Sequence, residues 1–573
     1  MTRYLVTSAL PYANGAPHFG HVCGAYLPAD VYVRTLRRQG EDVAFVCGTD
    51  EYGVAITIRA EEAGQAFPEY VAHWRTVIGS LFERLGIEFD IFSGTSISPF
   101  HEETAQQFFR DLNANGYLQK RANDQLYCLT DDMFLADRYV LGTCPKCGFA
   151  DARGDECPSC GAWLDPLTFE DPRCGICSTS PEKRSTTHWY LDIPKLRDEF
   201  IGEWIEGHPW KSNVEKFIQN LLKDVPQRAI TRDMRWGVPV PEDLADGETG
   251  KVLYVWFDAP IGYVSFTKEW CAAKGEPERW KDYWTGDDTR IVHFIGKDNI
   301  PFHCMVFPSM LHGSKAGYQL PWQVPANEFY NLQGRKFSTS GGWTIDLEDF
   351  FERYDAEAAR FYLLSSLPET ADSEFLWEEF QRVNNSSLAG NIGNLATRVL
   401  KFIVKNFDGR IPALHEEHRE EMDRVLLEEC GAFGDPAEEV LKFRFRRAAE
   451  QLVANASVAN VFVDRMAPWA LRKTDLAKAE SALNTLCEWI GWLASWMTPF
   501  MPGKAQSLWQ MLGQQSDLTN ADWPGSPTRD TWRRLEAGTA LGEVAALFAR
   551  VDDDTIRGEI ESLEARAAAA TKD

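Results

Sequence analysis

Two histidines, His18 and His21, lie three residues apart in the segment LPYANGAPHFGH, where a turn rich in proline and glycine leads into a predicted helix. The first turn of a helix presents free N–H groups and a partial positive charge, which suit phosphate oxygens. Imidazole N–H groups there can donate hydrogen bonds as negative charge develops during a displacement at phosphorus. The pattern predicts a phosphate site, although two surface histidines or half of a metal site share this spacing.

A second candidate for phosphate chemistry stands far along the chain, in GRKFSTSGG at residues 334–342. Glycine and serine favour a flexible loop that can close over a triphosphate, and Lys336 within it can stabilise a charged transition state. A plain solvated loop has the same composition. The occurrence of both segments in one chain favours a phosphate site more than either segment does alone.

Six of the 13 cysteines fall between Cys144 and Cys177, as three C-x-x-C pairs. In a reducing compartment this spacing favours metal over disulfides. Two such turns separated by nine residues can close a tetrahedral zinc site that has no open position. We therefore expect a structural zinc ion bound by Cys144, Cys147, Cys157 and Cys160, and an insertion that folds once metal is bound.

The third pair, Cys174 and Cys177, lacks a fourth cysteine pair to complete a site. Cys128 and Asp131 have the same x-x spacing, and aspartate can ligate zinc. A second site with three cysteines and one aspartate is therefore one interpretation. The alternative is a vestigial knuckle with free thiols.

The elements that must position these groups are read from hydrophobic runs. Apolar strands are expected at 4–8, 43–47, 252–257 and 291–295, with a helix from 18 to 38 between the first two. This order predicts parallel strands joined by right-handed crossovers. Beyond residue 385 the chain changes to long amphipathic stretches, such as 389–406 and 437–475, which predict a helical bundle.

Length and composition set the outer limits. A chain of 573 residues with 44% hydrophobic residues is expected to form two to four packed units. We see no run of about 18 apolar residues and no secretory leader, so we expect a cytoplasmic protein with no membrane span. The formal charge of −26 argues against broad electrostatic capture of nucleic acid, but not against a local, shape-specific RNA contact.

The paired segments and the blocks between them resemble one family. LPYANGAPHFGH and GRKFSTSGG are similar to the HIGH and KMSKS signatures of class I aminoacyl-tRNA synthetases. Along nearly the whole chain the resemblance extends to the methionyl-tRNA synthetase family, through GTDEYG, FLADRYVLGTCPKCG, YVWFDAPIGY, HFIGKDNIPFH, GNLATR and APW. The resemblance implies a methionine–tRNA ligase that forms methionyl-adenylate and pyrophosphate and then esterifies the 3′ end of tRNA(Met).

The resemblance implies specific roles at the nucleotide site. The catalytic residues would be His18, His21, Lys297 and Lys336, with ATP contacts also from Gly20, Ser338 and Thr339, and Mg²⁺ accompanying ATP. Thr339 and Phe337 depart from the KMSKS pattern. Some family members with such a loop are competent enzymes, and the adjacent Arg335 can supply the missing charge.

A methionine site must bury an unbranched thioether, which aromatic walls suit, and must bind an α-ammonium group. By resemblance, Asp50 pairs with the ammonium, and the side-chain pocket consists of Leu10, Tyr12, Trp256, Ala259, Pro260, Tyr263 and His303. Asn299 stands where a relative carries isoleucine. Without the resemblance, an aromatic-rich strand end would be read as ordinary core.

In GNIGNLATRVLKF, Asn394 and Arg398 are four residues apart and share one helix face, while Trp469 lies on another predicted helix. Asn, Arg and Trp suit the reading of unstacked bases, and the resemblance assigns these three to the CAU anticodon. A plain helical bundle with a buried tryptophan is the alternative.

We therefore expect an α/β fold, an open parallel Rossmann-like catalytic sheet split by a zinc-binding insertion and followed by an α-helical bundle. The catalytic domain is expected in two halves, 1–117 and 231–325, with the insertion at 118–230 between them. A linking segment with the KFSTS loop is expected at 326–385, an anticodon-binding bundle at 386–540 and a C-terminal helix at 541–573. We expect a monomer. The rival readings are a class I synthetase for leucine, valine or cysteine, and a catalytically impaired paralogue that binds RNA.

Overall fold

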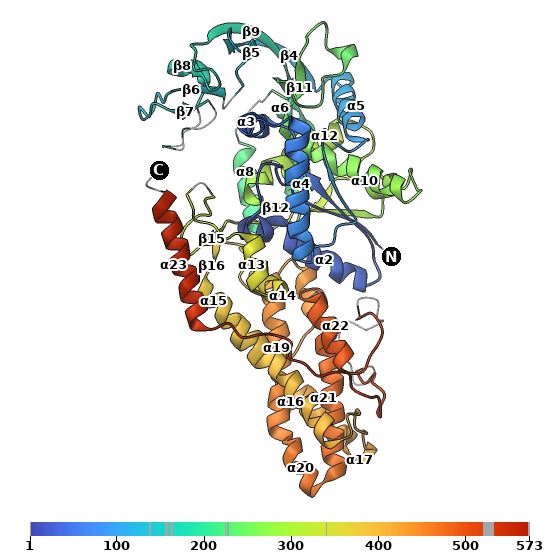
Figure 1. Cartoon of the computed structure of the whole chain (residues 1–573). Coiled ribbons are helices and arrows are strands. Elements are labelled where there is room, and N and C mark those ends of the chain that lie inside the picture. The colour runs from blue at the N-terminus through green and yellow to red at the C-terminus, as the bar shows by residue number, and fades with distance from the viewer. Residues whose placement is uncertain are drawn as a thin grey trace.

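The computed structural model is elongated, with an α/β body between a small upper lobe and a helical lower lobe (Figure 1). It describes residues 2–136, 139–154, 157, 159–160, 164–223, 225, 229–339, 341–518 and 532–570. None of the helices in these ranges is long and apolar enough to cross a membrane.

The centre of the body is a parallel sheet with the strand order β13-β12-β1-β2-β3, and β14 pairs with β12. Its strands are β1 (Arg3–Ser8), β2 (Asp42–Thr49), β3 (Ile91–Gly94), β12 (Thr289–Gly296), β13 (Pro321–Gln323) and β14 (Ala326–Asn327). Leu5 pairs with Ala44 on one side and Ile291 on the other, and all three are fully buried. Apolar strands of this kind are typical of a sheet covered on both faces, and the predicted parallel sheet is confirmed.

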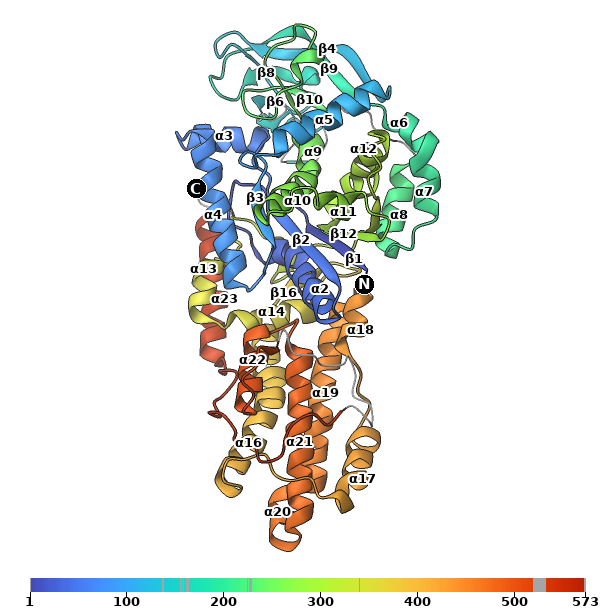
Figure 2. The same cartoon turned by 90° about the vertical axis from the view of Figure 1, so that its right-hand side faces the viewer.

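Helices cover both faces of the sheet (Figure 2). The predicted helix after β1 runs without interruption from Phe19 to Arg38, with a π-helical stretch at Val22–Tyr26 between α1 (Phe19–His21) and α2 (Leu27–Arg38). The other helices of the body are α3 (Val54–Glu62), α4 (Phe67–Arg84), α5 (His101–Ala114), α10 (Gly262–Ala273), α11 (Trp280–Trp284) and α12 (Phe307–Gly313).

The prediction of a strand at 252–257 is wrong. Only β11 (Lys251–Leu253) is extended, and it pairs antiparallel with β10 (Thr231–Asp233), outside the central sheet. The aromatic residues that suggested a buried strand form a short helix instead, α9 (Val255–Asp258), which leads through a 3₁₀ turn at Ala259–Ile261 into α10. Short apolar runs do not distinguish a strand from a buried helical turn.

The insertion forms the upper lobe. A long antiparallel pair, β4 (Leu118–Cys128) with β9 (Glu182–Leu191), extends away from the body and carries β5 (Met133–Phe134). At its end lies a second small sheet of β6 (Val140–Thr143), β7 (Ala152–Arg153) and β8 (Glu170–Cys174). The chain returns to the body through α6 (Ile193–Leu196), α7 (Gly202–Glu206) and α8 (Ser212–Leu221).

A compact segment links the sheet to the lower lobe. It comprises β15 (Tyr330–Leu332), α13 (Leu347–Arg353), α14 (Ala356–Ser365), β16 (Ser373–Phe375) and α15 (Trp377–Arg382). Aromatic rings hold it to the start of α1, because Phe19 lies 5.0 Å from Phe350 and 5.1 Å from Phe375 between ring centres. The segment is therefore fixed against the helix that begins at the two histidines.

The lower lobe is the predicted helical bundle. After a π-helical stretch at Val383–Gly393 come α16 (Asn394–Asn406), α17 (Glu416–Arg424), α18 (Pro436–Leu441), α19 (Phe445–Met466), α20 (Pro468–Thr474), α21 (Leu476–Met497) and α22 (Pro502–Met511). The stretch expected as helical from 437 to 475 is three helices. Phe443 and Ala467 break it with positive φ angles of 58° and 40°, and Pro468 starts the next helix.

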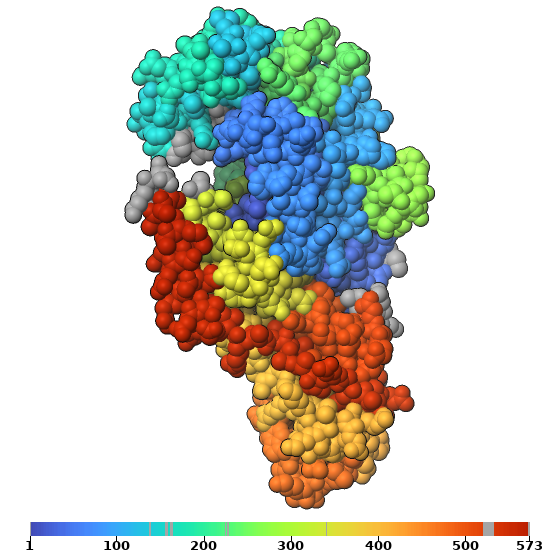
Figure 3. Space-filling model, in the orientation of Figure 1, coloured from blue at the N-terminus to red at the C-terminus, as the bar shows by residue number. Residues whose placement is uncertain are grey.

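The last helix, α23 (Asp553–Ala570), returns to the body and lies beside α15. In Figure 3 the surface is hollowed between the insertion and α23.

Candidate active site

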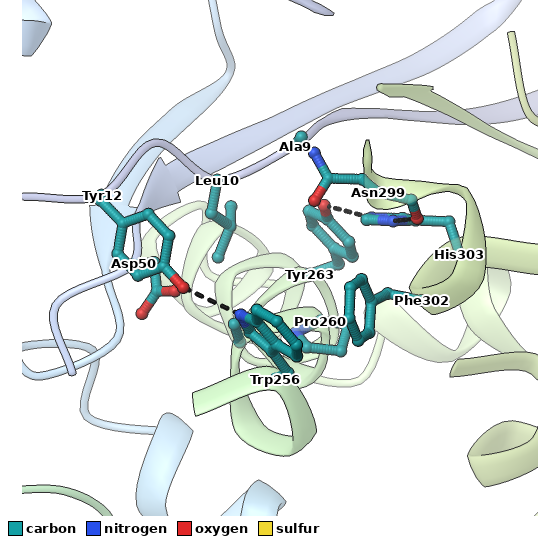
Figure 4. A pocket seen from close by; sticks show the side chains of 11 residues that line it. Ala9, Leu10, Tyr12, Asp50, Trp256, Pro260, Tyr263, Asn299, Phe302 and His303 are labelled. Carbon is teal, nitrogen blue, oxygen red and sulfur yellow. Dashed lines mark hydrogen bonds between the residues drawn. The ribbon is translucent and has the colours of Figure 1, made fainter. Parts of the chain in front are cut away.

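A pocket opens at the carboxyl ends of β1, β2 and β12, where open parallel sheets bind ligands. All eight residues expected to bind an amino acid lie around it (Figure 4), and three further residues complete the lining. The lining residues are Ala9, Leu10, Tyr12, Asp50, Trp256, Ala259, Pro260, Tyr263, Asn299, Phe302 and His303. The helical turns at 255–261 bring Trp256, Ala259 and Pro260 to this place.

Hydrogen bonds fix the aromatic walls of the pocket. The indole N–H of Trp256 donates to the Tyr12 hydroxyl over 2.9 Å. His303 Nδ1 lies 3.0 Å from the Asn299 carbonyl oxygen, which only accepts, so Nδ1 carries the proton. Burial lowers the pKa of His303 to about 4, and Nε2 of the neutral ring therefore accepts the Tyr263 hydroxyl proton over 2.8 Å. The walls are rigid and uncharged, as a thioether requires.

Asp50 supplies the carboxyl group of the pocket and is only 3% exposed. Its backbone is fixed, because its N–H donates to Pro11 O and its carbonyl accepts from Ala13 N–H, each over 2.9 Å. Burial raises the pKa of Asp50 well above its usual range, and Asp258 raises it further. A buried carboxyl group of this kind gains most from a cationic partner such as an ammonium group.

His18 and His21 stand at the start of α1, as the sequence predicts, and their ring centres are 3.9 Å apart. Gly20 N–H donates to His18 Nδ1 over 3.1 Å, and His18 N–H donates to His21 Nδ1 over 3.2 Å. Burial lowers the pKa of His18 to about 2, with His21 lowering it further, and burial lowers that of His21 to about 4. Each neutral ring therefore carries its proton on Nε2 and can donate it to a ligand.

The loop that carries Lys336 lies directly on this histidine pair. The Phe337 ring stacks on His18 with 4.3 Å between centres and 6° between planes. Lys336 Nζ lies 5.1 Å, and Lys297 Nζ 3.9 Å, from the centre of the Phe329 ring. The structure thus brings together the histidine and lysine groups that the sequence separates.

The other residues expected to contact ATP form hydrogen bonds within the protein. Lys297 Nζ donates to Glu328 over 2.8 Å and to Asp372 over 3.2 Å. Ser338 Oγ accepts from Gly341 N–H over 3.1 Å, and the carbonyl of Thr339 accepts from Gly342 N–H over 3.2 Å. Ser338 and Thr339 therefore shape the turn of the loop.

Comparison with known proteins decides the family. A family model described as tRNA synthetases class I (M) matches residues 4–400, and one for the anticodon binding domain of methionyl tRNA ligase matches residues 419–569. The chain belongs to the methionyl-tRNA synthetase family of class I. It is 45% identical to the methionine–tRNA ligase of Protochlamydia amoebophila, over 98% of this chain and 79% of the relative. It is 42% identical to that of Rubrobacter xylanophilus, over 98% of this chain and 97% of the relative.

Solved structures of the methionyl-tRNA synthetase family have the same fold. The Mycobacterium tuberculosis methionyl-tRNA synthetase in complex with methionyl-adenylate matches with a TM-score of 0.74 at 25% identity. The match covers 96% of this chain and 100% of the other.

The first cysteine cluster of this methionyl-tRNA synthetase family member fits a zinc ion. The sulfur atoms of Cys144, Cys147, Cys157 and Cys160 lie within 4.8 Å of one another. Cys144 Sγ is 3.9 Å from Cys160 Sγ, and Cys147 Sγ is 3.7 Å from Cys157 Sγ. A tetrahedron with zinc–sulfur bonds of about 2.3 Å has edges of about 3.8 Å, so the spacing suits zinc.

The second cluster is more compact. Asp131 Oδ2 lies 3.1 Å from Cys128 Sγ and 3.0 Å from Cys174 Sγ, and Cys177 Sγ is 3.4 Å from Cys128 Sγ. All four side chains lie within reach of one ion. Thr179 Oγ1 also contacts the Cys177 thiol at 3.0 Å. These distances match hydrogen-bonded thiols better than a zinc tetrahedron, which needs sulfur–oxygen edges of about 3.5 Å.

Two of the three predicted anticodon residues are in contact. The Arg398 guanidinium lies 4.3 Å from the Trp469 ring centre and 3.0 Å from Asp464. Asn394 is exposed on the same helix, one turn earlier, and Trp469 is 36% exposed. The three side chains form one accessible face at the end of the bundle. Trp469 is therefore not the buried tryptophan that the alternative interpretation requires.

Sequence reasoning missed several groups around the site. Phe302 and Ala9 line the pocket, and Phe337, noted only as a departure from the family signature, covers His18. Phe302 lies in the block HFIGKDNIPFH, which gave the only available signal. Asn299, whose contact was open, does line the pocket, and its carbonyl orients His303.

Proposed function

We propose that this chain activates L-methionine with ATP and transfers it to the 3′ end of tRNA(Met). The observation that carries the proposal is the stacking of Phe337 on His18 at 4.3 Å, which brings the Lys336 loop onto the histidine pair at the start of α1. The adjacent pocket joins a buried carboxyl group to aromatic walls, and methionine has the matching ammonium group and thioether.

In the first step the methionine carboxylate oxygen forms a bond to the α-phosphorus of ATP. The bond from the α-phosphorus to the bridging oxygen breaks, and pyrophosphate leaves with the electron pair. His18 and His21 donate Nε2–H to phosphate oxygens, while Lys336 and Lys297 offset the charge that develops. Mg²⁺ bound to ATP supplies further charge when it is present. Lys297 must exchange Glu328 and Asp372 for phosphate in this step.

In the second step a hydroxyl group of the terminal ribose of the tRNA attacks the methionyl carbonyl carbon, and AMP leaves. The hollow between the insertion and α23 supports an approach of the tRNA end from that side (Figure 3). We assign recognition of the CAU anticodon to Asn394, Arg398 and Trp469, because Arg and Trp already form a stacking pair that a base can join.

Amino-acid-dependent exchange of pyrophosphate into ATP tests the first step. We expect methionine to support exchange, homocysteine to be the strongest competitor, and leucine, valine and cysteine to be poor substrates. The difference of one methylene is worth only about 1–3 kcal/mol, which explains why homocysteine competes. Exchange that prefers leucine, valine or cysteine to methionine would contradict the proposal.

We propose that zinc binds Cys144, Cys147, Cys157 and Cys160 and has a structural role, with Cys128, Asp131, Cys174 and Cys177 as a weaker second site. Metal analysis of the purified protein tests both. One zinc ion per chain is expected, bound at the first site. A protein without zinc would contradict the first site, and two zinc ions per chain would support the second site as well.

We further propose that the chain acts as a cytoplasmic monomer with the six segments expected from the sequence. The aromatic contacts of Phe19 with Phe350 and Phe375 support a linking segment that belongs to the catalytic body. Sedimentation equilibrium is expected to give the mass of one chain, 64.9 kDa.

A further inference from the structure

A second buried carboxyl group lies beside the amino-acid pocket and takes no part in the steps above. Asp258 ends α9, directly before Ala259 and Pro260 of the pocket lining, and it is 0% exposed. Its Oδ2 lies 3.3 Å from His101 Nε2, and its Oδ1 has no hydrogen-bond partner among the described residues. An unpartnered buried carboxyl oxygen is costly and calls for a functional reason.

The hydrogen bonds around His101 fix where its protons lie. Ser265 Oγ donates to the Gly262 carbonyl over 3.1 Å and therefore accepts from His101 Nδ1, which is 3.0 Å away. A neutral His101 then has a bare Nε2. The contact between Nε2 and Asp258 is a hydrogen bond only if one proton lies between them, either on the carboxyl group or on the ring.

Burial determines which partner holds this proton when no ligand is bound. Burial raises the pKa of Asp258 well above its usual range, although the backbone N–H groups of Asp258 and Ala259 lower it in part, and burial lowers the pKa of His101 to about 4. Both directions favour the uncharged pair, with Asp258 protonated and donating to His101. A nearby positive charge has the opposite effect, because it stabilises the ionised carboxylate.

The electrostatic influence of Asp258 reaches the pocket. Besides burial, which is the largest cause, Asp258 contributes to raising the pKa of Asp50 and that of Tyr12. Both of these residues line the pocket. The other acid next to Asp50, Glu51, is already paired with Arg75 and accepts a hydrogen bond from Thr49 over 2.7 Å. Of these two acids, Asp258 has no lysine or arginine partner among the described residues.

We propose that Asp258, held by His101, is a positioning residue that supplies a second negative charge to the α-ammonium site beside Asp50. This inference rests on the proposed function and deepens it. When the ammonium group enters, the proton moves from Asp258 Oδ2 to His101 Nε2. The O–H bond breaks and an N–H bond forms, so the pair becomes carboxylate and imidazolium without exchange of a proton with solvent. The pair stays neutral overall, and its carboxylate is present only when the ligand is bound.

The test uses Asp258→Asn, which keeps the size of the side chain and removes its charge. In methionine-dependent pyrophosphate exchange, we expect the KM for methionine to rise at least about tenfold, while the KM for ATP stays within about twofold. The inhibition constant of methioninol, which has the ammonium group but no carboxylate, should rise by a similar factor. That of 4-(methylthio)butanoate, which has the carboxylate but no ammonium group, should not change.

These two inhibitors separate a charge effect from damage to the pocket. If Asp258→Asn raises both inhibition constants equally, or changes neither, the inference is overturned. The matched control is Glu488→Gln, since Glu488 is a buried carboxyl group in the bundle that accepts from the backbone N–H groups of Arg534 and Leu535. It should leave all four constants unchanged.

Ser265→Ala provides a second variant if Asp258→Asn does not fold. It removes the acceptor that holds the His101 Nδ1 proton. The inhibition constant of methioninol should rise about threefold, and that of 4-(methylthio)butanoate should not change. A rise in the inhibition constant of methioninol alone confirms the inference, and equal changes in the two inhibition constants overturn it. If the wild-type chain shows no methionine-dependent exchange at all, the proposed function fails rather than this inference.

Discussion

Neutral histidines distinguish the proposed nucleotide site from one that attracts phosphate with imidazolium charge. The Nδ1 atoms of His18 and His21 accept backbone N–H groups, so both rings present Nε2–H whenever they are neutral. They act as oriented donors whose charge does not depend on pH in the physiological range. The positive charge then comes from Lys297 and Lys336 and from the helix start.

A titration of the free protein checks this assignment. The pKa of His18 is lowered to about 2 and that of His21 to about 4. Because both pKa values are depressed, the neutral rings persist as the pH falls from 8 to 5.5. Histidine ring resonances in NMR, assigned with His18→Gln and His21→Gln, should therefore not shift over this range. A midpoint near 6.5 for either ring would refute the neutral pair.

The residues of the pocket could be predicted because they lie in sequence blocks that resemble those of the methionyl-tRNA synthetase family. All eight residues expected from these blocks line one pocket. Asp258 and His101 could not be found in this way. Their pairing depends on two helices meeting, and nothing in the chain near His101 indicates its partner.

At the scale of elements, the loop that carries Lys336 is held from behind by the last helix. The backbone of Gly342 is so close to α23 that an added Cβ would lie 2.7 Å from the Arg566 carbonyl oxygen. The Arg566 guanidinium donates to Thr344 O over 3.0 Å. Further along α23, Glu559 accepts from the Tyr354 hydroxyl over 2.9 Å and pairs with Arg353. We infer that α23 sets the resting position of the loop.

Removal of α23 should therefore affect ATP more than methionine. A chain that ends after Asp552 is expected to show a KM for ATP raised at least about fivefold in pyrophosphate exchange, with the KM for methionine within about twofold. Arg557→Ala is the control, because this side chain is 66% exposed on α23 and, among the described residues, its ion-pair partner is Asp554 in the same helix. An unchanged KM for ATP in the shortened chain would show that α23 does not support the loop.

Strands were predictable where a short apolar run is buried in the parallel sheet, and the predictions failed for one aromatic run outside that sheet and for one long helical stretch. The strands at 4–8, 43–47 and 291–295 are present, because each is a fully buried run in a parallel sheet. The run at 252–257 folds as strand and then helix. The break at Phe443 was not visible, since phenylalanine does not normally favour a positive φ angle. The break at Ala467 is marked in the sequence by Pro468, which starts the next helix and cannot continue the one before it.

At the scale of the whole molecule, one buried arginine joins the catalytic body to the bundle. Arg360 in α14 is 0% exposed. It donates to Asp30 of α2 over 2.6 Å, to the carbonyls of Leu85 and Gly86 over 2.8 Å and 3.1 Å, and to those of Pro499 and Phe500 over 3.2 Å and 3.0 Å. Every partner lies in another part of the chain.

Replacing Arg360 should destabilise the whole chain. Arg360→Met leaves Asp30 and the carbonyl groups without this donor, and loss of one partner of a buried ion pair costs about 3–5 kcal/mol. Arg34, which also pairs with Asp30, favours the lower end of that range. Arg382→Met breaks an exposed pair with Glu379 and should change stability by less than about 1 kcal/mol. Equal free energies of unfolding in urea for the two variants would contradict this role.

The bundle end and the pocket lie at different parts of an elongated molecule, which allows their functions to be separated (Figure 1). Trp469→Ala removes the ring on which Arg398 stacks. Base stacking on an aromatic ring is worth about 1–3 kcal/mol, so the KM for tRNA should rise at least about fivefold while adenylate formation is unchanged. Leu476→Ala, another exposed apolar residue near the same turn, serves as the control. Equal loss in both steps would indicate a structural tryptophan.

Net charge was the weakest guide to the function of the whole molecule. A value of −26 argues against binding to nucleic acid in general, whereas the proposed RNA contact depends on a few side chains at one end of the bundle. The family match and the local geometry outweigh it, because a specific contact needs only a small surface of the right shape and charge.

The proposed activity requires that the histidine pair at the start of α1 and the distant Lys336 act on one triphosphate. The rate of methionyl-adenylate formation in a single turnover, measured for Lys336→Ala against the wild type, tests this most directly. We predict a fall of at least about 30-fold, which corresponds to about 2 kcal/mol of transition-state stabilisation, with the affinity for methionine unchanged. A rate close to that of the wild type would contradict the account.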